Sequence, residues 1–316
     1  MTDKTKIVII VGPTAVGKTN LSISLAQAID GEIISGDSMQ IYRRLDIGTA
    51  KVTKDEQAGI PHHLIDCVDV TQGYSVSDFQ KDARKAISAI EARGKVPIIV
   101  GGTGLYIEAL LYDLSFGGTV EETDLAYRHL KELEAREKGN LALWSELQMN
   151  DPKAAENIHP NNVKRVIRAL EVYHLTGKPF SSFQKEHTIK EPFYDAKIIG
   201  LTTDREVLYQ RINERVLNMF ELGLLEEAHW LYQQNIPNSQ AALGIGYKEL
   251  TAYFNGKINL EEAQKQIQQN SRRYAKRQLT WFRNRWAVVE WWDLIKNPNQ
   301  KATLIETIKT FLSNQK

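Results

Sequence analysis

The eight residues from Gly12 to Thr19 constrain the fold of this chain most strongly, because they read GPTAVGKT and fit the pattern G-x-x-x-x-G-K-[ST]. Residues 6–11 before them form an apolar run that predicts a buried strand, and residues 20–29 after them carry apolar residues at helical spacing. A strand, a glycine-rich loop and a helix in this order bring backbone N–H groups and a helix N-terminus to one point. The sequence therefore predicts that this loop binds a polyphosphate.

Positions within the loop have predicted tasks at the phosphates. The two glycines let the backbone wrap, Lys18 supplies a point charge, and the Thr19 hydroxyl is the predicted ligand of Mg²⁺. The predicted diphosphate-binding residues are Gly12, Pro13, Thr14, Ala15, Val16, Gly17, Lys18 and Thr19. The alternative is an ordinary turn between a strand and a helix.

The composition is typical of a soluble globular protein, with 42% hydrophobic and 25% charged residues among 316. A net charge of +1 argues neither for nor against nucleic-acid binding, so only local clusters of basic residues can indicate it. Cys67 is the only cysteine, which excludes an internal disulfide and a multi-cysteine zinc module and suits a reducing cytosol. Because no long apolar segment is present, we expect a cytoplasmic protein with no signal peptide and no membrane span.

The first 114 residues alternate between strand and helix patterns, which predicts an α/β fold with a parallel sheet flanked by helices. Further strands are predicted at 32–35 and 96–100, with a helix from about 77 to 94 between them. In such sheets ligands bind at the carboxyl ends of the strands. Three loops are therefore expected to converge there: 12–19, 36–40 and 101–104.

Residues 115–195 follow a different pattern, with helices predicted at 125–138, 141–148 and 162–175, and we interpret them as an inserted all-helical domain. The sheet is predicted to resume with a strand at 196–201, followed by a capping box at Thr203 and Glu206 and a helix through Asn218 or beyond. A helical region at 247–285 and a strand at 288–292 come last. The predicted catalytic core is thus 1–114 with 196–316.

The strand at 97–100 ends in Gly101-Gly102-Thr103-Gly104, where a P-loop hydrolase would place an aspartate for Mg²⁺ and water. This favours a group-transfer enzyme over a motor or switch NTPase. The glycine pair is either a plain tight turn or, with Thr103, a contact for a second substrate.

Asp37 lies just after the second predicted strand and so on the same rim as Lys18. A carboxylate there can accept a proton from an incoming nucleophile. The alternative is a helix N-cap or an Asx-turn. Arg211 and Arg215, four apart on a helix, would clamp a diphosphate leaving group or pair with Glu214 in solvent.

Residues 270–286 contain no acidic residue and interleave basic with aromatic side chains. Such a stripe suits phosphate backbones and unstacked bases. The alternative is a solvated basic helix whose Trp and Phe side chains face the core. A smaller basic cluster lies in the insertion, at Lys164, Arg165 and Arg168. The adjacent His62 and His63 are interpreted as structural or as loop contacts, not metal ligands.

With these motifs in order, the chain resembles the bacterial tRNA dimethylallyltransferases, also called tRNA isopentenyltransferases. The resemblance covers nearly the full length and rests on GPTAVGKT at 12–19, DSMQIY at 37–42, DIGTAK at 46–51, PHHLID at 61–66, GGTGLYI at 101–107, RALEVY at 168–173 and YAKRQLTWFR at 274–283. It implies a P-loop core with a helical insertion that contacts the tRNA anticodon arm.

The resemblance also implies the reaction: a dimethylallyl group passes from dimethylallyl diphosphate to the exocyclic amine of the adenosine 3′-adjacent to the anticodon, in tRNAs that read codons beginning with U. Mg²⁺ is the implied cofactor. Asp37 would act as base, Thr103 would contact the flipped nucleotide, and Arg215 would hold the diphosphate with the glycine-rich loop. The implied tRNA-binding residues are Asp37, Ser38, Met39, Gln40, Thr103, Arg128, Lys164, Arg165, Arg168, Lys276, Arg277, Gln278, Trp281 and Arg283.

Two other function classes compete with this interpretation. Small-molecule and nucleoside kinases also pair a P-loop with an aspartate on the next strand, and a nucleic-acid binding module could carry a vestigial P-loop. The length, the helical insertion and the basic C-terminal helix weigh against a kinase. We expect the enzyme to be a monomer.

Overall fold

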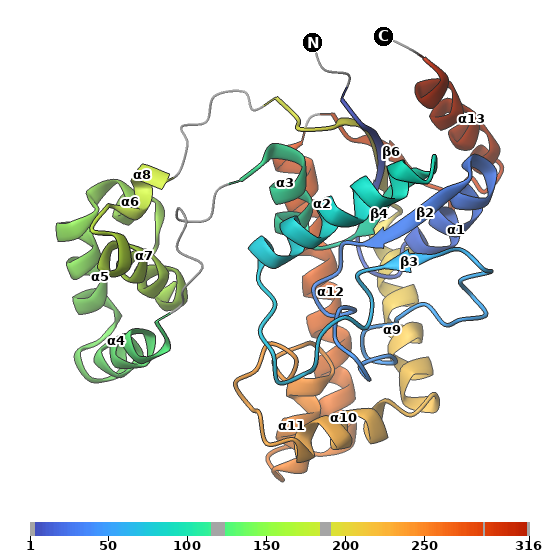
Figure 1. Ribbon diagram of the computed structural model, residues 1–316. Coiled ribbons are helices and arrows are strands. Elements are labelled where there is room, and N and C mark those ends of the chain that lie inside the picture. The colour runs from blue at the N-terminus through green and yellow to red at the C-terminus, as the bar shows by residue number, and fades with distance from the viewer. Residues whose placement is uncertain (1–3, 115–123, 184–190, 287, 315–316) are drawn as a thin grey trace. The chain divides into compact units, whose positions relative to one another are not determined.

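Figure 1 shows a computed structural model that describes residues 4–114, 124–183, 191–286 and 288–314. Over these residues the strands form one six-stranded parallel sheet in the order β3-β2-β4-β1-β5-β6. The strands are β1 (Lys6–Val11), β2 (Gly31–Ser35), β3 (His62–His63), β4 (Val96–Gly101), β5 (Asp195–Leu201) and β6 (Glu290–Trp292). The predicted α/β fold with a P-loop-type parallel sheet is confirmed.

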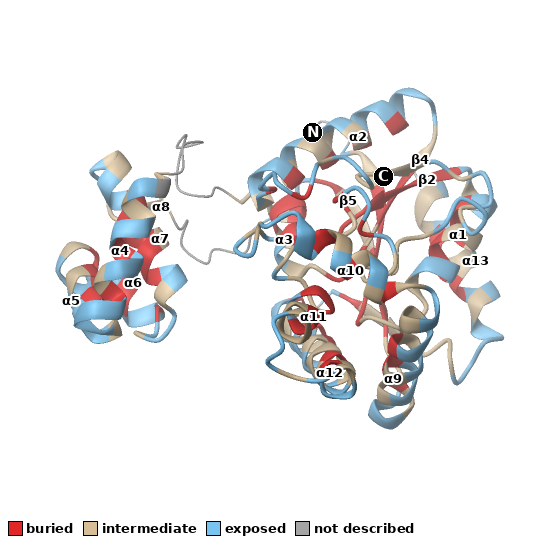
Figure 2. Cartoon of the chain, turned by 90° about the horizontal axis from the view of Figure 1, so that it is seen from below, coloured by how far each residue is buried: buried red, intermediate tan, exposed pale blue. Residues whose placement is uncertain are grey.

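The sheet is buried on both faces, because successive side chains of a strand point in opposite directions. Ile7 and Ile9 of β1 pack with α2 (Val76–Ala92), α3 (Gly104–Tyr112) and α12 (Leu260–Arg285). Val8 and Ile10 pack instead with α1 (Lys18–Ile29) and α13 (Gln300–Ser313). In Figure 2 the strands of the sheet and parts of the helices around them are coloured as buried. The unbroken apolar run of β1 is the sequence pattern of such a doubly covered strand.

Four helices after β5 extend the core beyond the sheet: α9 (Arg205–Glu221), α10 (Leu224–Gln233), α11 (Tyr247–Phe254) and α12. The predicted single helical region 247–285 is interrupted, because Gly256 has a positive φ of 67° and Asn259 caps α12 by accepting a 2.8 Å hydrogen bond from the Glu262 N–H. None of the helices described here has both the length and the apolarity needed to cross a membrane.

Residues Leu114–Glu191 form a compact unit of their own, whose described part is mainly helical. It contains α4 (Leu125–Lys138), α5 (Asn140–Asn150), α6 (Pro152–Asn157), α7 (Val163–Thr176) and α8 (Phe180–Phe183), packed around side chains such as Leu147 and Leu170. The core unit resumes at Pro192 and not at 196. The reason is that the Phe193 N–H donates a 2.7 Å hydrogen bond to the Leu111 carbonyl, and Tyr194 is buried in the core.

One local prediction was wrong, and one short strand was not predicted. The helix α9 starts at Arg205, one residue later than a Thr203 cap requires, and the carboxylate of the actual N-cap residue Asp204 pairs with Lys296 at 2.5 Å. Thr203 makes no capping bond, and its buried hydroxyl has no partner within the described part of the chain. The two-residue strand β3 was not predicted, because His62 and His63 extend only by pairing with Ile33 and Ile34 of β2.

Candidate active site

The glycine-rich loop connects β1 to α1 at the carboxyl end of the sheet. Gly12 has φ +150°, and a Cβ atom there would lie 2.7 Å from the Leu201 carbonyl oxygen of β5. Gly17, the residue before α1, has φ +98°. Both positions therefore need glycine, one for close approach to a neighbouring strand and one for a left-handed turn. The loop wraps as its sequence predicts.

The Lys18 amine lies inside this loop, where it donates hydrogen bonds to the carbonyls of Gly12 at 3.0 Å and Pro13 at 2.7 Å. Burial lowers the pKa of Lys18 to about 8, the nearby Asp37 carboxylate acts in the opposite direction, and the Arg215 guanidinium lowers it further. Lys18, Asp37 and Arg215 are thus close enough to influence one another electrostatically, although they come from three different elements.

Asp37 follows β2, and one of its oxygens, Oδ1, accepts a 2.8 Å hydrogen bond from the Met39 N–H. This is the Asx-turn that the sequence left as an alternative to a catalytic role. Asp37 also lines a cavity of about 320 Å³ beside the loop. A carboxylate has about four lone-pair sites, so the turn leaves acceptor capacity for a substrate.

Thr103 lies next to Asp37's loop, at the start of α3. Its hydroxyl accepts a 3.1 Å hydrogen bond from the Ser38 N–H and approaches the Ser38 hydroxyl at 3.4 Å. It does not cap α3 through its side chain. The predicted convergence of the loops after β2 and β4 is therefore present in the structure.

Gln278, on α12, joins the glycine-rich loop to the loop after β4. Its side-chain oxygen accepts a 3.0 Å hydrogen bond from the Thr14 N–H, and its amide nitrogen donates a 3.1 Å bond to the Gly102 carbonyl. Gln278 is only 5% exposed. Both of its polar atoms are thus committed to backbone groups, which gives it a structural task that its predicted place in a tRNA-binding segment did not suggest.

Two arginines of α9 reach the same loop. Arg215 donates a 3.0 Å hydrogen bond to the Thr14 hydroxyl, and the Arg211 Nε–H donates one of 3.0 Å to the Ala15 carbonyl. Glu214 instead accepts a hydrogen bond from Gln210. Of the two roles considered for these arginines, the geometry favours contact with the phosphate-binding loop over pairing in solvent.

A cavity of about 320 Å³ opens beside these residues. Its polar lining includes Thr14, Asp37, Ser38, Arg215, Tyr274 and Arg277. Its apolar lining comes mainly from α9, α10, α12 and the segment 243–246 and includes Ile212, Val216, Met219, Leu224, Leu243, Ile245 and Ile267. This volume is at the small end of ligand pockets, so the cavity suits a small molecule with one charged and one apolar part.

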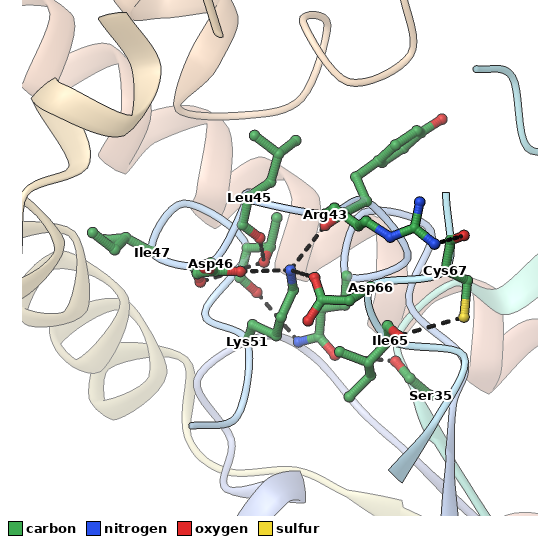
Figure 3. Close-up of polar contacts among 12 residues, drawn as sticks. Ser35, Arg43, Leu45, Asp46, Ile47, Lys51, Ile65, Asp66 and Cys67 are labelled. Atoms are coloured by element: carbon green, nitrogen blue, oxygen red, sulfur yellow. Dashed lines mark hydrogen bonds and ion pairs between the residues drawn. The ribbon is translucent and has the colours of Figure 1, made fainter. Parts of the chain in front are cut away.

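One wall of the cavity is formed by Gly48 and Thr49, within residues 43–52, which we call the wall loop. Lys51 holds this loop from inside: its amine lies 2.6 Å from the Asp46 carboxylate, 2.6 Å from the Asp66 carboxylate and 2.8 Å from the Tyr42 carbonyl (Figure 3). The Lys51 side chain is 5% exposed. Its buried charge is therefore balanced by two carboxylates.

The predicted tRNA-binding residues after Asp37 divide into two groups. Ser38 and Met39 line the cavity. The polar atoms of Gln40 are instead bonded within the protein. Its side-chain oxygen accepts a 3.0 Å hydrogen bond from the Ser35 hydroxyl, and its amide nitrogen donates to the carbonyls of Thr49 and Ala50.

The basic stripe of α12 is partly surface and partly core. Lys276, Arg277 and Arg283 are exposed, whereas Phe282 is buried and Trp281 is half-buried. The Trp281 indole packs so closely on Gly104 that no side chain fits at that glycine. The stripe thus offers exposed positive charge, while its aromatic side chains serve mainly the core, as the alternative interpretation proposed.

Four predicted tRNA-binding residues belong to the helical unit. Arg128 of α4 makes two 2.7 Å hydrogen bonds to the fully buried Glu171 carboxylate of α7, and Arg168 makes one of 2.6 Å. Burial alone would raise the pKa of Glu171, but these two guanidinium groups bring it below its ordinary value. Lys164 is exposed and Arg165 likewise, on the N-terminal part of α7.

Several cavity residues escaped the sequence analysis. Tyr274 was assigned no role beyond its place in the basic stripe and in the motif at 274–283, and the cavity-lining segment 243–246 was assigned no role. A signal was present in Gly244 and Gly246, since glycines close together outside a helix pattern often mark backbone close to a ligand. Burial and the negative charge of Asp37 raise the pKa of Tyr274, so its phenol stays protonated at neutral pH.

Comparison with known proteins gives a consistent picture. The model of the family described as IPP transferase matches residues 40–285. The tRNA dimethylallyltransferase of Geobacillus thermodenitrificans is 54% identical over 310 residues, which are 98% of this chain and 97% of the relative. That of Bacillus subtilis is 54% identical over 291 residues, 92% and 91% of the two chains.

Solved structures agree with these relatives. The full-length tRNA isopentenylpyrophosphate transferase of Bacillus halodurans has a TM-score of 0.73 and 48% identity, covering 98% of this chain and 97% of that one. A eukaryotic dimethylallyltransferase acting on tRNA has a TM-score of 0.84 and 31% identity, covering 99% and 80%. The chain with its glycine-rich loop, Asp37 and the amphiphilic cavity therefore belongs to the IPP transferase family.

Proposed function

We propose that this protein transfers a dimethylallyl group from dimethylallyl diphosphate to the exocyclic amine of the adenosine 3′-adjacent to the anticodon, in tRNAs that read codons beginning with U. The observation that carries this proposal is the 320 Å³ cavity, which combines Asp37, Arg215 and Thr14 with an apolar lining. An allylic diphosphate has the same two parts. The relatives named tRNA dimethylallyltransferase supply the nature of the acceptor.

On the donor side, the bond between the allylic carbon and the diphosphate oxygen breaks, and that carbon gains positive character as negative charge collects on the departing diphosphate. The Lys18 ammonium, the Arg215 guanidinium and the backbone N–H groups of the glycine-rich loop would stabilise that charge. Because the loop and Arg215 are already fixed by hydrogen bonds through Thr14, little reorganisation is needed during the reaction. The apolar lining of the cavity would hold the dimethylallyl group and exclude water.

On the acceptor side, the exocyclic amine is a weak nucleophile, because its lone pair is delocalised into the adenine ring. The new bond joins this nitrogen to the allylic carbon, and the Asp37 carboxylate would accept the proton that the nitrogen loses. Thr103, hydrogen-bonded to the Ser38 backbone, would contact the adenine. The base must leave its stack to reach this site, as in other enzymes that act on a base.

The residues around Thr19 fit Mg²⁺. Thr19, Ser22, Ser35 and Gln40 surround a small hollow of about 30 Å³ and offer the oxygen donors that this ion prefers. The described residues contain no group of three or more His, Cys, Asp or Glu that could hold a metal. Thr19 would therefore bind the ion together with diphosphate oxygens and water, and bound Mg²⁺ would neutralise charge on the leaving group.

The exposed cations Lys276, Arg277 and Arg283 of α12 support binding of the anticodon arm, with Lys164 and Arg165 of the helical unit as further contacts. Since its proposed acceptor is tRNA, we place the enzyme in the cytoplasm. We propose that the enzyme acts as a monomer.

The test is to incubate the protein with labelled dimethylallyl diphosphate, Mg²⁺ and an anticodon stem-loop that carries adenosine 3′ of the anticodon, and to analyse the RNA by mass spectrometry. The product should gain one dimethylallyl group at that adenosine. A matched stem-loop with guanosine at this position should gain none. Absence of transfer to any adenosine-containing stem-loop would refute the proposal, and phosphoryl transfer from ATP to a small acceptor would point to the kinase alternative.

A further inference from the structure

Three successive backbone N–H groups of the wall loop point at one carboxylate. The Asp46 N–H and the Ile47 N–H donate to Oε2 of Glu227 at 2.7 and 2.8 Å, and the Gly48 N–H donates to its Oε1 at 2.9 Å. Successive N–H groups arranged in this way form a concavity that binds an anion. Here the anion is a side chain of α10, which lies about 180 residues further along the chain.

A fourth hydrogen bond joins the same carboxylate to α11. The Tyr247 hydroxyl donates to Oε1 of Glu227 at 2.7 Å, and Tyr247 is 2% exposed. A Cβ atom at Gly48 would lie 2.6 Å from the Tyr247 hydroxyl oxygen, so the loop backbone packs directly on that ring. Glu227 thus connects the wall loop, α10 and α11.

The opposite side of the wall loop is held by Lys51. The Asp46 residue takes part in both anchors: its N–H donates to Glu227 and its carboxylate pairs with Lys51. Lys51 in turn pairs with Asp66 (Figure 3). The Arg44 guanidinium makes a further contact with α10, since it lies 3.9 Å from the centre of the Trp230 ring. These contacts hold the loop without any of these side chains entering the cavity lining.

The part of the loop that Glu227 holds reaches the cavity at Gly48. Gly48 and Thr49 line it, and so does Leu224, one helical turn before Glu227 on α10. We propose that Glu227 is a positioning residue for the 320 Å³ cavity. It fixes the backbone at 46–48 against α10, so that the apolar lining of the cavity keeps the shape that a dimethylallyl group requires. The proposal rests on the proposed function, because it assigns this apolar lining to the prenyl donor.

The charge state of the side chain is central to this role, since a carboxylate offers only acceptors to the four donors that surround it. In Glu227→Gln one of the two oxygens becomes an NH₂ donor. The Tyr247 hydroxyl can turn to accept a hydrogen bond, but a backbone N–H cannot. At least one N–H of residues 46–48 therefore loses its acceptor, although the size of the side chain is unchanged.

The experiment compares Glu227→Gln with the wild type and with Glu226→Gln, a neighbour on the same helix that takes no part in the wall-loop anchor. We expect the KM for dimethylallyl diphosphate to rise about tenfold in Glu227→Gln, the change that corresponds to leaving one donor without a partner. The KM for the stem-loop and kcat at saturating donor should change much less. The Glu226→Gln variant should match the wild type in all three quantities.

A second measurement, which does not depend on enzyme activity, tests whether Glu227 fixes the backbone of the wall loop. In hydrogen–deuterium exchange, Glu227→Gln should lose protection at the amides of 46–48 and keep it in β1. Unchanged protection at 46–48, or an unchanged donor KM, would overturn the proposal. If Glu227→Gln does not fold, Tyr247→Phe removes one of the four hydrogen bonds and should raise the donor KM by a smaller factor, and no rise would again overturn it.

These outcomes separate the two proposals. A wild-type protein that transfers no dimethylallyl group would refute the proposed function, whereas the exchange measurement would still show whether Glu227 fixes the wall loop. An active wild type with an unaltered Glu227→Gln variant would refute only the positioning role.

Discussion

Arg215 donates a 3.0 Å hydrogen bond to the hydroxyl of Thr14, a residue 201 positions earlier in the chain. The glycine-rich loop itself supplies one cation, Lys18. The hydrogen bond to Thr14 holds a second cation, Arg215, beside the loop. Burial lowers the pKa of Arg215 below its ordinary value, whereas the Asp37 carboxylate raises it, and arginine stays charged at any working pH. The proposed diphosphate site would therefore be built from two distant segments of the chain.

Arg215→Gln should lower the rate of transfer by about 10²- to 10³-fold, the usual effect of removing one fixed donor from a developing negative charge. The measurement is the rate constant for transfer to the stem-loop under single-turnover conditions. Arg205→Gln on the same helix is the control, because Arg205 lies over the Tyr209 ring and does not contact the loop. Equal rates for the two variants would contradict the assignment of Arg215.

Asp37→Asn tests the base without disturbing the turn. The side-chain oxygen that the substituted amide retains can still accept the Met39 N–H, so the loop should keep its conformation. We expect transfer to slow by about 10²- to 10⁴-fold, with stem-loop affinity unchanged. Binding is measured by fluorescence anisotropy and transfer by rapid quench. A variant that transfers at the wild-type rate would remove Asp37 from the chemistry.

Lys18→Met should lose activity and gain stability. The folded-state pKa of Lys18, about 8, lies below its ordinary value of 10.5, so folding disfavours the charged form. At pH 7 the wild type holds this charge at a cost, and the variant should be more stable by up to about 3 kcal/mol. The advantage should shrink as pH rises from about 8 to 10.5. Denaturant unfolding at several pH values measures it, and a destabilised variant at pH 7 would contradict it.

The same pKa predicts how the reaction depends on pH. Because kcat/KM reports the free enzyme, kcat/KM for the donor should fall above pH about 8, where Lys18 loses its proton. Initial rates at low donor concentration across the range from about one pH unit below this value to about one unit above it provide the measurement. The residual activity of Lys18→Met should lack this decline, and a wild-type profile that stays flat would exclude Lys18 as the titrating group.

Arg128→Met should destabilise the helical unit before any effect on tRNA is considered. Removing one partner of the buried Glu171 leaves its charge poorly compensated, at a cost of about 3–5 kcal/mol. The pKa of Glu171 should rise when Arg128 is removed, and protonation of Glu171 relieves the uncompensated charge, so the stability difference between variant and wild type should shrink as the solution is acidified. The double variant Arg128→Met/Glu171→Met should recover much of the loss in thermal unfolding. A single variant as stable as the wild type would contradict the structural role of this pair.

The sheet and the glycine-rich loop could be predicted because their signals are local. The apolar run 6–11 and the two glycines act within a dozen residues. The contacts of Gln278 could not be predicted, since it bonds the backbones of Thr14 and Gly102, and a backbone group leaves no trace in the sequence.

Charge pairing was hidden for a similar reason. Arg128 and Glu171 lie 43 positions apart and on different helices, so the sequence shows a cation without its partner. The wall loop is a further example: nothing near residues 46–48 indicates that their N–H groups end on Glu227. The predictions that failed or were incomplete thus concern tertiary contacts of polar groups, whereas the pattern of apolar residues predicted most strands and helices correctly.

The close fit between Gly102 and Gln278 has a consequence for how this sequence can change. A Cβ atom at Gly102 would lie 2.0 Å from the amide nitrogen of Gln278, so an alanine at 102 requires the end of the Gln278 side chain to move. A smaller residue at 278 would leave the Thr14 N–H and the Gly102 carbonyl without their partner. Either substitution therefore disturbs the hydrogen bonds that Gln278 makes, and we expect the residue tolerated at one of these positions to depend on the residue at the other, both in evolution and in a redesigned enzyme.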